Sequence, residues 1–192
     1  GDSYRFHMSL IMVDTIVTRV ADEAVTIAFV IIEGEPILVD RVVVDGLEGV
    51  PEALAVERGL PASIGEPFDR YANRATLDTI IHRLRNTGYP EAEAFLGYDL
   101  RFLERRATVR FAVVPGPRRR LGEVRIRRSG PNGTSPEISN SAVRNLAGLS
   151  TGDLYRERQL ERAKRLLYQS EAFASVEVRP LRDAVLGETV PR

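Results

Sequence analysis

The sequence predicts an α+β protein built from tandem β-α-α-β-β modules, each with two helices packed on a three-stranded mixed sheet. The main observation is a strand–break–strand pattern that occurs twice, in Val25–Gly46 and in Thr108–Gly130. The glycines of the two breaks, Gly34 and Gly116, lie 82 positions apart, and a helical pattern follows each copy. A spacing of this size indicates repeated domains, because solenoid units repeat every 20 to 50 residues or so.

The composition is that of an ordinary globular chain. Hydrophobic residues make up 43% of the 192 residues and charged residues 28%, and the formal net charge is zero. The absence of cysteine excludes disulfides, thiolate catalysis and zinc–thiolate sites, and it is compatible with an oxidising compartment such as a bacterial periplasm. No apolar run reaches the roughly 18–20 residues of a membrane-spanning helix.

The repeat predicts two full modules behind a shorter piece. Residues 1–34 are expected to be the terminal hairpin of a truncated preceding module, with strands at Leu10–Arg19 and Val25–Ile32, and the first few residues can belong to a tag. The two modules are expected at 35–116 and 117–192. In the second, the sequence stops where a closing strand would follow, so we expect its last strand to be missing.

In the first module, the patterns predict each element in turn. The opening strand is Ile37–Val44, and a short helix at Pro51–Arg58 ends at Gly59. A long helix runs from Pro67 to about Thr87, with a core stripe of Leu77, Ile80, Ile81 and Leu84. The hairpin Ala92–Phe102 and Thr108–Val114 completes the module.

The second module repeats this order. Leu121–Arg128 is the expected opening strand, and the short helix Ile138–Ala147 is expected to be capped by Ser139 or Ser141 and closed by Gly148. A long helix at Asp153–Ser170 and a strand at Ala174–Arg179 follow.

This ordered set of motifs resembles the POTRA domain. The shared features are the joint glycine after an apolar strand, the loop Leu60-Pro-Ala-Ser-Ile-Gly65 followed by Phe68, and Gly88-Tyr89 after the long helix. The joint VIIEGEPILVDRVVVDG is similar to those of the BamA/TamA outer-membrane protein assembly family. The sequence departs from the family pattern at the turn-rich segment Ser129–Pro136 and at Ala172-Phe173, where Gly-Tyr is usual.

The resemblance implies a periplasmic, chaperone-like array attached to an outer-membrane β-barrel of the same protein. Its partners would be unfolded outer-membrane β-barrel proteins and accessory periplasmic proteins or lipoproteins. The implied contact is β-augmentation, in which a client strand pairs with an open sheet edge. We expect this client edge at Ala94, Leu96, Tyr98 and Leu100 in the first module and at Val176 and Val178 in the second. Strand exchange between copies of the fragment is a further expectation.

A cluster of arginines is the most distinctive surface feature in the sequence. This basic patch consists of Arg118, Arg119, Arg120, Arg125, Arg127 and Arg128. It can be a solvated sheet face in an arginine-rich chain, or it can bind an acidic partner such as lipid headgroups or a neighbouring subunit. Nucleic acid is not expected, because residues 117–128 contain no aromatic side chain on which bases could stack.

The remaining predictions concern joints and chemistry. Gly34, Pro36, Gly116 and Pro117 are expected to form the joints between modules. No catalytic residue, metal site or cofactor site is predicted, because the two histidines lie in unrelated segments and no phosphate-binding glycine motif is present. The alternative to an outer-membrane assembly module is a structural or docking module of the cell envelope, followed by an RNA-binding α/β domain.

Overall fold

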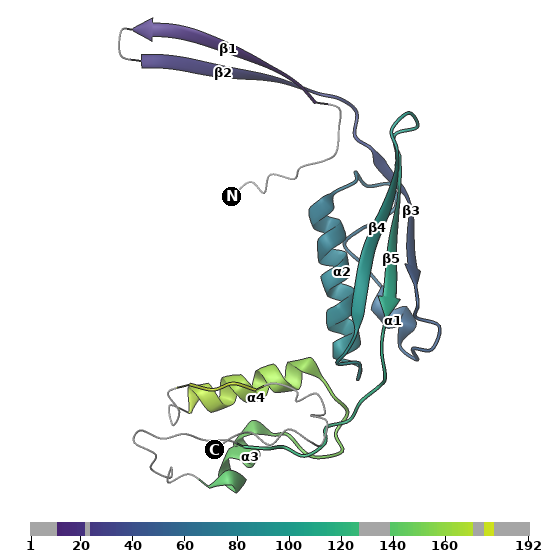
Figure 1. Cartoon of the computed structure of the whole chain (residues 1–192), viewed down its shortest axis with the longest axis vertical. Coiled ribbons are helices and arrows are strands. Elements are labelled where there is room, and N and C mark those ends of the chain that lie inside the picture. The colour runs from purple at the N-terminus through teal and green to yellow at the C-terminus, as the bar shows by residue number, and fades with distance from the viewer. Residues whose placement is uncertain (1–10, 22–23, 127–138, 171–174, 179–192) are drawn as a thin grey trace, which may run out of the picture. The chain divides into compact units, whose positions relative to one another are not determined.

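The structure is a computed structural model, and it describes residues 11–21, 24–126, 139–170 and 175–178 (Figure 1). Its contacts divide the chain into two compact units. The first unit contains Gly1–Ile81 and Ala92–Pro115, and the second contains His82–Glu91 and Gly116–Arg192.

The first element is a two-stranded hairpin. Strand β1 (Ile11–Ala21) pairs antiparallel with β2 (Ala24–Glu33), with Ile11 opposite Glu33 and a register shift between Arg19 and Ala21. The two strands predicted from β-branched runs are therefore confirmed, each a residue or two longer than its sequence pattern.

A three-stranded mixed sheet follows in the first unit. It is formed by β3 (Leu38–Asp45), β4 (Glu93–Arg101) and β5 (Arg106–Val114), in the order β3-β5-β4. Strand β5 lies in the centre, parallel to β3 and antiparallel to β4. The mixed sheet with its two helices confirms the predicted α+β class and the β-α-α-β-β order for this module.

Helices α1 (Ala53–Glu57) and α2 (Arg70–Arg85) come between β3 and β4, and α2 lies along the sheet (Figure 1). The predicted stripe on α2 is confirmed for Leu77, Ile80 and Leu84, which are buried, whereas Ile81 is half-buried. Apolar periodicity did not indicate the two polar residues buried on α2, Asn73 and Thr76. The other side of the core is the inner face of β5, formed by Ala107, Val109, Phe111 and Val113.

Thr76 is buried because its hydroxyl has two partners. It accepts a hydrogen bond from the backbone N–H of Ala62 at 2.7 Å and donates one to the carbonyl of Ala72 at 2.8 Å. The helix is thereby tied to the loop that precedes it, and a polar side chain is accommodated in the core at little cost.

In the second unit the described helices are α3 (Asn140–Ala147) and α4 (Glu157–Gln169). The side chain of Ser139 accepts a hydrogen bond from the N–H of Ala142 at 3.1 Å, so the predicted cap of α3 is confirmed. Gly148 closes the helix in the left-handed conformation, with φ of 63°. The described apolar core consists of Val143, Tyr155, Ala163 and Leu167, together with Tyr89 and Gly88 from the turn after α2.

The same three backbone hydrogen bonds occur in both units. In the first, Val39 N–H donates to Glu66, Gly65 N–H donates to Val39 and Phe68 N–H donates to Ile37. In the second, Leu121 N–H donates to Asp153, Gly152 N–H donates to Leu121 and Tyr155 N–H donates to Arg119. All six bonds are between 2.7 and 3.1 Å long. The repeat seen in the sequence is therefore also a repeat of hydrogen-bond geometry.

Within the described residues, the two predicted strands of the second module are not found. Residues 121–126 and 175–178 are irregular, and an isolated bridge between Arg120 and Leu154 is the strand-like pairing described there. Val176 and Val178 are half-buried but belong to no sheet. In the first unit, β3 and β4 are strands because each pairs with the central strand β5. The segment that corresponds to β5 in the second module lies outside the described residues, and no strand ladder is described beside 121–126 or 175–178. The remaining residues of those two predictions lie outside the described part.

Candidate functional site

The sheet of the first unit has β3 at one edge and β4 at the other, and among the described contacts only the start of β3 is covered. At the start of β3, the backbone of residues 37–39 bonds to the loop 65–68, as described above. Strand β4 forms the opposite edge and pairs only with β5 among the described strands. One row of backbone groups along β4 is therefore left for another strand to bind.

The predicted edge residues of β4 share the inner face of the sheet. Ala94, Leu96, Tyr98 and Leu100 stand opposite the buried residues of β5, so their placement on one side is confirmed. The ring of Tyr98 packs edge-on against Phe68, with centroids 5.2 Å apart, yet it remains 48% exposed. An incoming strand would extend this partly covered apolar face. That these residues contact a client remains a prediction.

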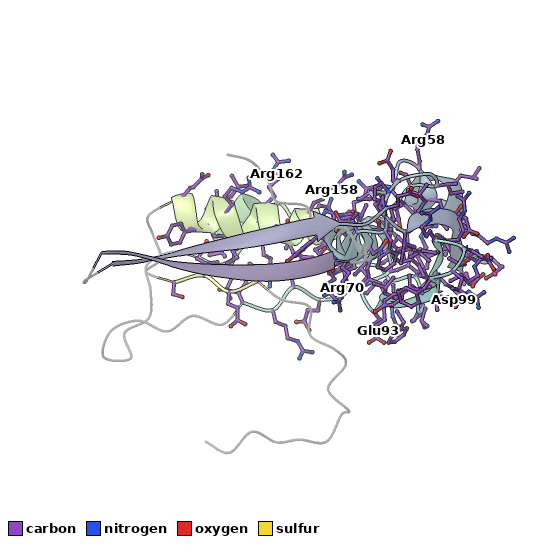
Figure 2. The ribbon with its side chains drawn as sticks, turned by 90° about the horizontal axis from the view of Figure 1, so that it is seen from above. Arg58, Arg70, Glu93, Asp99, Arg158 and Arg162 are labelled. Atoms are coloured by element: carbon purple, nitrogen blue, oxygen red, sulfur yellow. The ribbon has the colours of Figure 1, made fainter. Side chains whose placement is uncertain are left out.

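Charged residues flank the apolar middle of β4. Glu93 and Asp99 lie on its outer face (Figure 2), with Phe95, which is 57% exposed, between them. Charges on an edge strand limit indiscriminate pairing with other edges. The backbone groups of this edge are therefore free to pair, while the charged side chains on its outer face limit which strands can pair with it.

A polar clamp on the outer face joins all three strands. Asp40 lies at the register shift of β3, and its carboxylate accepts hydrogen bonds from Arg101 of β4 and from the hydroxyl of Thr108 of β5, the latter at 3.2 Å. Partial burial acts to raise the pKa of Asp40, but the hydrogen bond and charge of Arg101, with the Thr108 hydroxyl, outweigh it and lower the pKa below its usual value. The clamp holds β4 in register while its other edge stays open.

The basic patch is engaged in local contacts. Arg118 donates to the carbonyl of Thr87 at 3.1 Å, and Arg119 is 3.4 Å from the carboxylate of Glu91. Arg120 donates to the carbonyl of Gly152 at 2.8 Å, and Arg125 pairs with Glu123 at 2.9 Å. Arg127 and Arg128 lie outside the described residues. The four described arginines are exposed. Arg118, Arg119 and Arg120 each contact another segment of the second unit, whereas Arg125 contacts only its own segment.

The residues of the two predicted joints lie on the surface. Gly116 has a left-handed φ of 69°, and a Cβ there would lie 3.3 Å from the Cβ of Glu91, so glycine is favoured at this position. Gly34 and Pro36 are exposed in an irregular segment. Pro117 is exposed beside Gly116.

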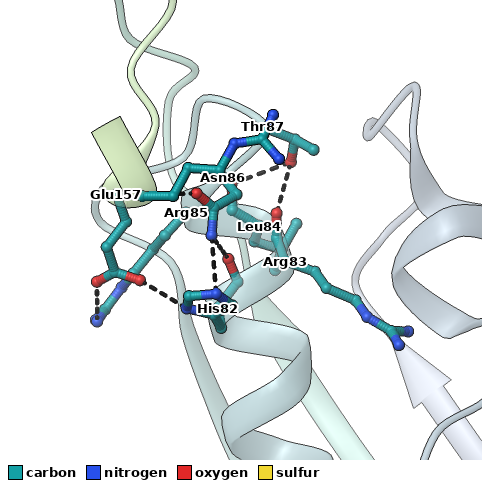
Figure 3. Close-up of polar contacts among 8 residues, drawn as sticks. His82, Arg83, Leu84, Arg85, Asn86, Thr87 and Glu157 are labelled. Atoms are coloured by element: carbon teal, nitrogen blue, oxygen red, sulfur yellow. Dashed lines mark hydrogen bonds and ion pairs between the residues drawn. The ribbon is translucent and has the colours of Figure 1, made fainter. Parts of the chain in front are cut away.

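Sequence reasoning missed a polar cluster in the second unit (Figure 3). The carboxylate of Glu157, in the first turn of α4, is 3.0 Å from Nδ1 of His82 and 3.4 Å from Nη1 of Arg85. The side-chain oxygen of Asn86 accepts a hydrogen bond from the backbone N–H of Arg158 at 2.9 Å. These contacts fix residues 82–86 to the N-terminus of α4. No local pattern could reveal them, because the partners are more than 70 residues apart.

Sequence reasoning also missed a basic stripe on α4. Arg158, Arg162 and Arg165 are exposed and spaced for one helix face, and Figure 2 shows the first two on the same side of α4. With Arg156 they line a surface groove of about 610 Å³. The spacing of these arginines within the predicted helix was the available signal.

Within the described ranges, no three His, Cys, Asp or Glu side chains gather where they could hold a metal ion. In the same residues, no helix is long and apolar enough to cross a membrane.

Comparison with known proteins identifies the architecture. No protein-family model matches the sequence, and neither does any curated protein. The solved structures with a matching fold include the crystal structure of Haemophilus influenzae BamA POTRA3-5, with a TM-score of 0.60 and 20% sequence identity. The match covers 91% of this chain and 68% of that one. The chain has a POTRA-like fold. The ordered motifs that suggested it, although each is short, therefore identified the fold correctly.

Proposed function

We propose that this POTRA-like chain is the periplasmic array of an outer-membrane assembly or translocation protein. It binds unfolded β-barrel clients and accessory periplasmic proteins, and it carries out no catalysis itself. The observation that supports this most is the asymmetry of the first sheet, whose β3 edge is covered at its start by the loop 65–68 while the β4 edge is open. A protein that receives strands needs one such edge and must protect the other.

The mode of binding is β-augmentation along β4. Backbone hydrogen bonds would supply affinity that does not depend on client sequence, and alternate client side chains would pack beside Leu96 and Tyr98 on the inner face or Phe95 on the outer face. This chemistry suits clients that share strand pattern rather than sequence. The Asp40–Arg101 clamp would keep β4 extended and ready to pair, which lowers the entropy cost of binding.

Site-specific photo-crosslinking in cells tests the proposal. A benzoyl-phenylalanine probe replaces Phe95 or Tyr98, both exposed aromatic residues of β4, so the added benzoyl group can extend into solvent. Tyr71, an exposed aromatic residue on α2, is the matched control. We expect adducts with several nascent β-barrel proteins from the two β4 positions and few from Tyr71.

Two other outcomes would redirect the proposal. Adducts from the β4 positions with one fixed protein would make the chain a docking scaffold of the cell envelope rather than a client receptor. Equal adduct yields from Phe95, Tyr98 and Tyr71 would contradict edge binding altogether.

A further inference from the structure

The turn that joins β4 to β5 has an unusual composition. It consists of Phe102, Leu103, Glu104 and Arg105, and the N–H of Arg105 donates to the carbonyl of Phe102 at 3.2 Å. Hairpin turns of this kind favour Gly, Asn, Asp or Pro, which satisfy special backbone angles or bond to their own backbone. Here two large apolar residues occupy the first positions, and an arginine takes the left-handed conformation with φ of 53°. A turn that lacks the residue types its geometry favours is often found at a functional site.

The side chains of Phe102 and Leu103 are exposed to solvent. Leu103 is 103% exposed, the highest value among the large hydrophobic residues described, and Phe102 is 63% exposed. They are adjacent at the end of a hairpin, so they form a projecting tip and not a scattered pair of surface residues. Exposed apolar groups that gather at one point of a surface mark an interaction site.

Hydrogen bonds and ion pairs from neighbouring segments hold the turn in place. The carbonyl of Arg105 accepts a hydrogen bond from the N–H of Leu38 at 3.0 Å, and its guanidinium pairs with Glu35. Arg101 pairs with Asp40 and lies 3.3 Å from Glu104. The tip is therefore presented by an anchored backbone, which reduces the entropy lost when it binds.

Basic side chains surround the apolar pair. Arg101, Arg105 and Arg106 flank it on both sides. Arg101 pairs with Asp40 and Glu104, and Arg105 pairs with Glu35, so carboxylates already neutralise two of these three arginines. Arg106 is exposed and has no carboxylate partner among the ion pairs described. Phenylalanine or leucine with adjacent arginine is the composition of segments that enter the headgroup region of a bilayer, where apolar groups reach the acyl chains and guanidinium groups bind phosphates.

We propose that residues 101–106, the hairpin tip, dock on an anionic lipid bilayer by inserting Phe102 and Leu103 into the interface. A bilayer is favoured over a protein partner for two reasons. The tip is convex, and a membrane accepts a projecting apolar group without a preformed pocket. The exposed guanidinium of Arg106 also matches lipid phosphates in charge. The inference does not depend on client binding at β4, because it uses side chains of the turn and not the backbone of the strand.

Tryptophan fluorescence provides a direct test, because the chain contains no tryptophan. L103W in the full 192-residue chain places the probe at the tip, and L54W places it at another exposed leucine, 86% accessible on α1. With vesicles of phosphatidylethanolamine and phosphatidylglycerol, we expect a blue shift and quenching by brominated acyl chains for L103W only. The absence of both signals for L103W, or equal signals at the two sites, would overturn the proposal.

Vesicle co-sedimentation extends the test to the side chains. The double variant F102S/L103S should bind these vesicles about tenfold more weakly or worse, because the apolar contact is lost. R106Q should weaken binding about fivefold and reduce its dependence on salt. L54S is the control and should bind as the parent does. If F102S/L103S keeps vesicle binding but loses crosslinks to a protein partner, the tip is a protein-binding surface and the membrane proposal is wrong.

Discussion

Gly46, the residue that follows β3, has a conformation and surroundings that only glycine fits. Its φ is +93°, and a Cβ at this position would lie 2.0 Å from the backbone carbonyl oxygen of Val113. We predict that Gly46→Ala lowers the free energy of unfolding by about 2–4 kcal/mol, because backbone strain is added to a clash that no rotamer can relieve.

Gly49, three residues further on, is the matched control for this prediction. A Cβ at Gly49 would have no neighbouring atom within 4 Å, and the φ of this residue is not positive. Gly49→Ala should therefore change stability by less than about 0.5 kcal/mol. Urea denaturation of the two variants measures the difference. Equal effects would show that the close approach of Gly46 to Val113 is not a constraint.

The contribution of Asp40 to the stability of the fold should depend on pH. Its pKa is lowered in the folded protein, so its ionised form stabilises the fold above the unfolded pKa of about 3.9, and this stabilisation is lost as pH falls through the folded pKa. Asp40→Asn should therefore be less stable than the parent at neutral pH, and the gap should close below about pH 4. Thermal unfolding of the variant and the parent at a series of pH values measures this stability difference.

Asp45→Asn provides the comparison, because Asp45 makes a longer and more exposed pair with Arg110, at 3.7 Å, and should matter little. A gap between Asp40→Asn and the parent that persists unchanged at low pH would contradict an electrostatic role for the clamp.

At the scale of elements, α2 offers a matched pair of threonines. Thr76 is buried and accepts a hydrogen bond from Ala62, whereas the hydroxyl of Thr79 donates only to the carbonyl one turn earlier, at 2.6 Å. Thr76→Val should cost about 1–3 kcal/mol, because it leaves the N–H of Ala62 buried without a partner. Thr79→Val should stay within about 0.5 kcal/mol. Urea denaturation midpoints of the two variants measure the difference. A similar loss of stability in both would contradict the role of the Thr76–Ala62 hydrogen bond in holding α2 to the 60–66 loop.

The elements also show what sequence can and cannot predict. Periodicity located α2 and its apolar stripe, and turn chemistry located Gly59, Ser139 and Gly148, because these signals are local. Periodicity missed Thr76, because its burial is explained by a partner elsewhere in the chain, the N–H of Ala62. It also missed Asn73, which is buried although its side-chain Nδ2 has no hydrogen-bond partner among the described residues. In the second module, residues 121–126 and 175–178 are irregular although their composition predicted strands, because β-propensity alone does not determine pairing with a neighbouring strand.

In the candidate sites, too, the sequence predicted features with local signals and missed those that depend on distant contacts. The sequence indicated that the Ala92–Phe102 strand would be an edge if its hairpin partner were central, and the order β3-β5-β4 meets that condition. The exposed tip at Phe102 and Leu103 was missed, because apolar residues next to a strand look like part of the core until the turn is placed. Glu157 was missed because its partners, His82 and Arg85, lie in the other predicted module.

At the scale of the whole molecule, the two units differ in how they are stabilised. The first combines three paired strands with a core that includes Phe68, Phe111, Ile80 and Leu84, all almost fully inaccessible. The second rests, in its described part, on two helices, a few buried side chains and the backbone bonds of residues 119–121. We therefore predict two unfolding transitions, with the second unit unfolding first, because less apolar surface and fewer backbone ladders protect it.

Core truncations in each unit test this prediction. Phe111→Ala should lower the stability of the first unit by about 3–5 kcal/mol, and Leu167→Ala that of the second by about 2–4 kcal/mol, each with little effect on the other transition. Hydrogen exchange read by mass spectrometry assigns the transitions, since amides of β5 should be protected longest and those of α3 and α4 should exchange earlier. A single transition that both truncations shift equally would mean that the two units fold as one cooperative body, and the repeat would then be a feature of architecture but not of stability.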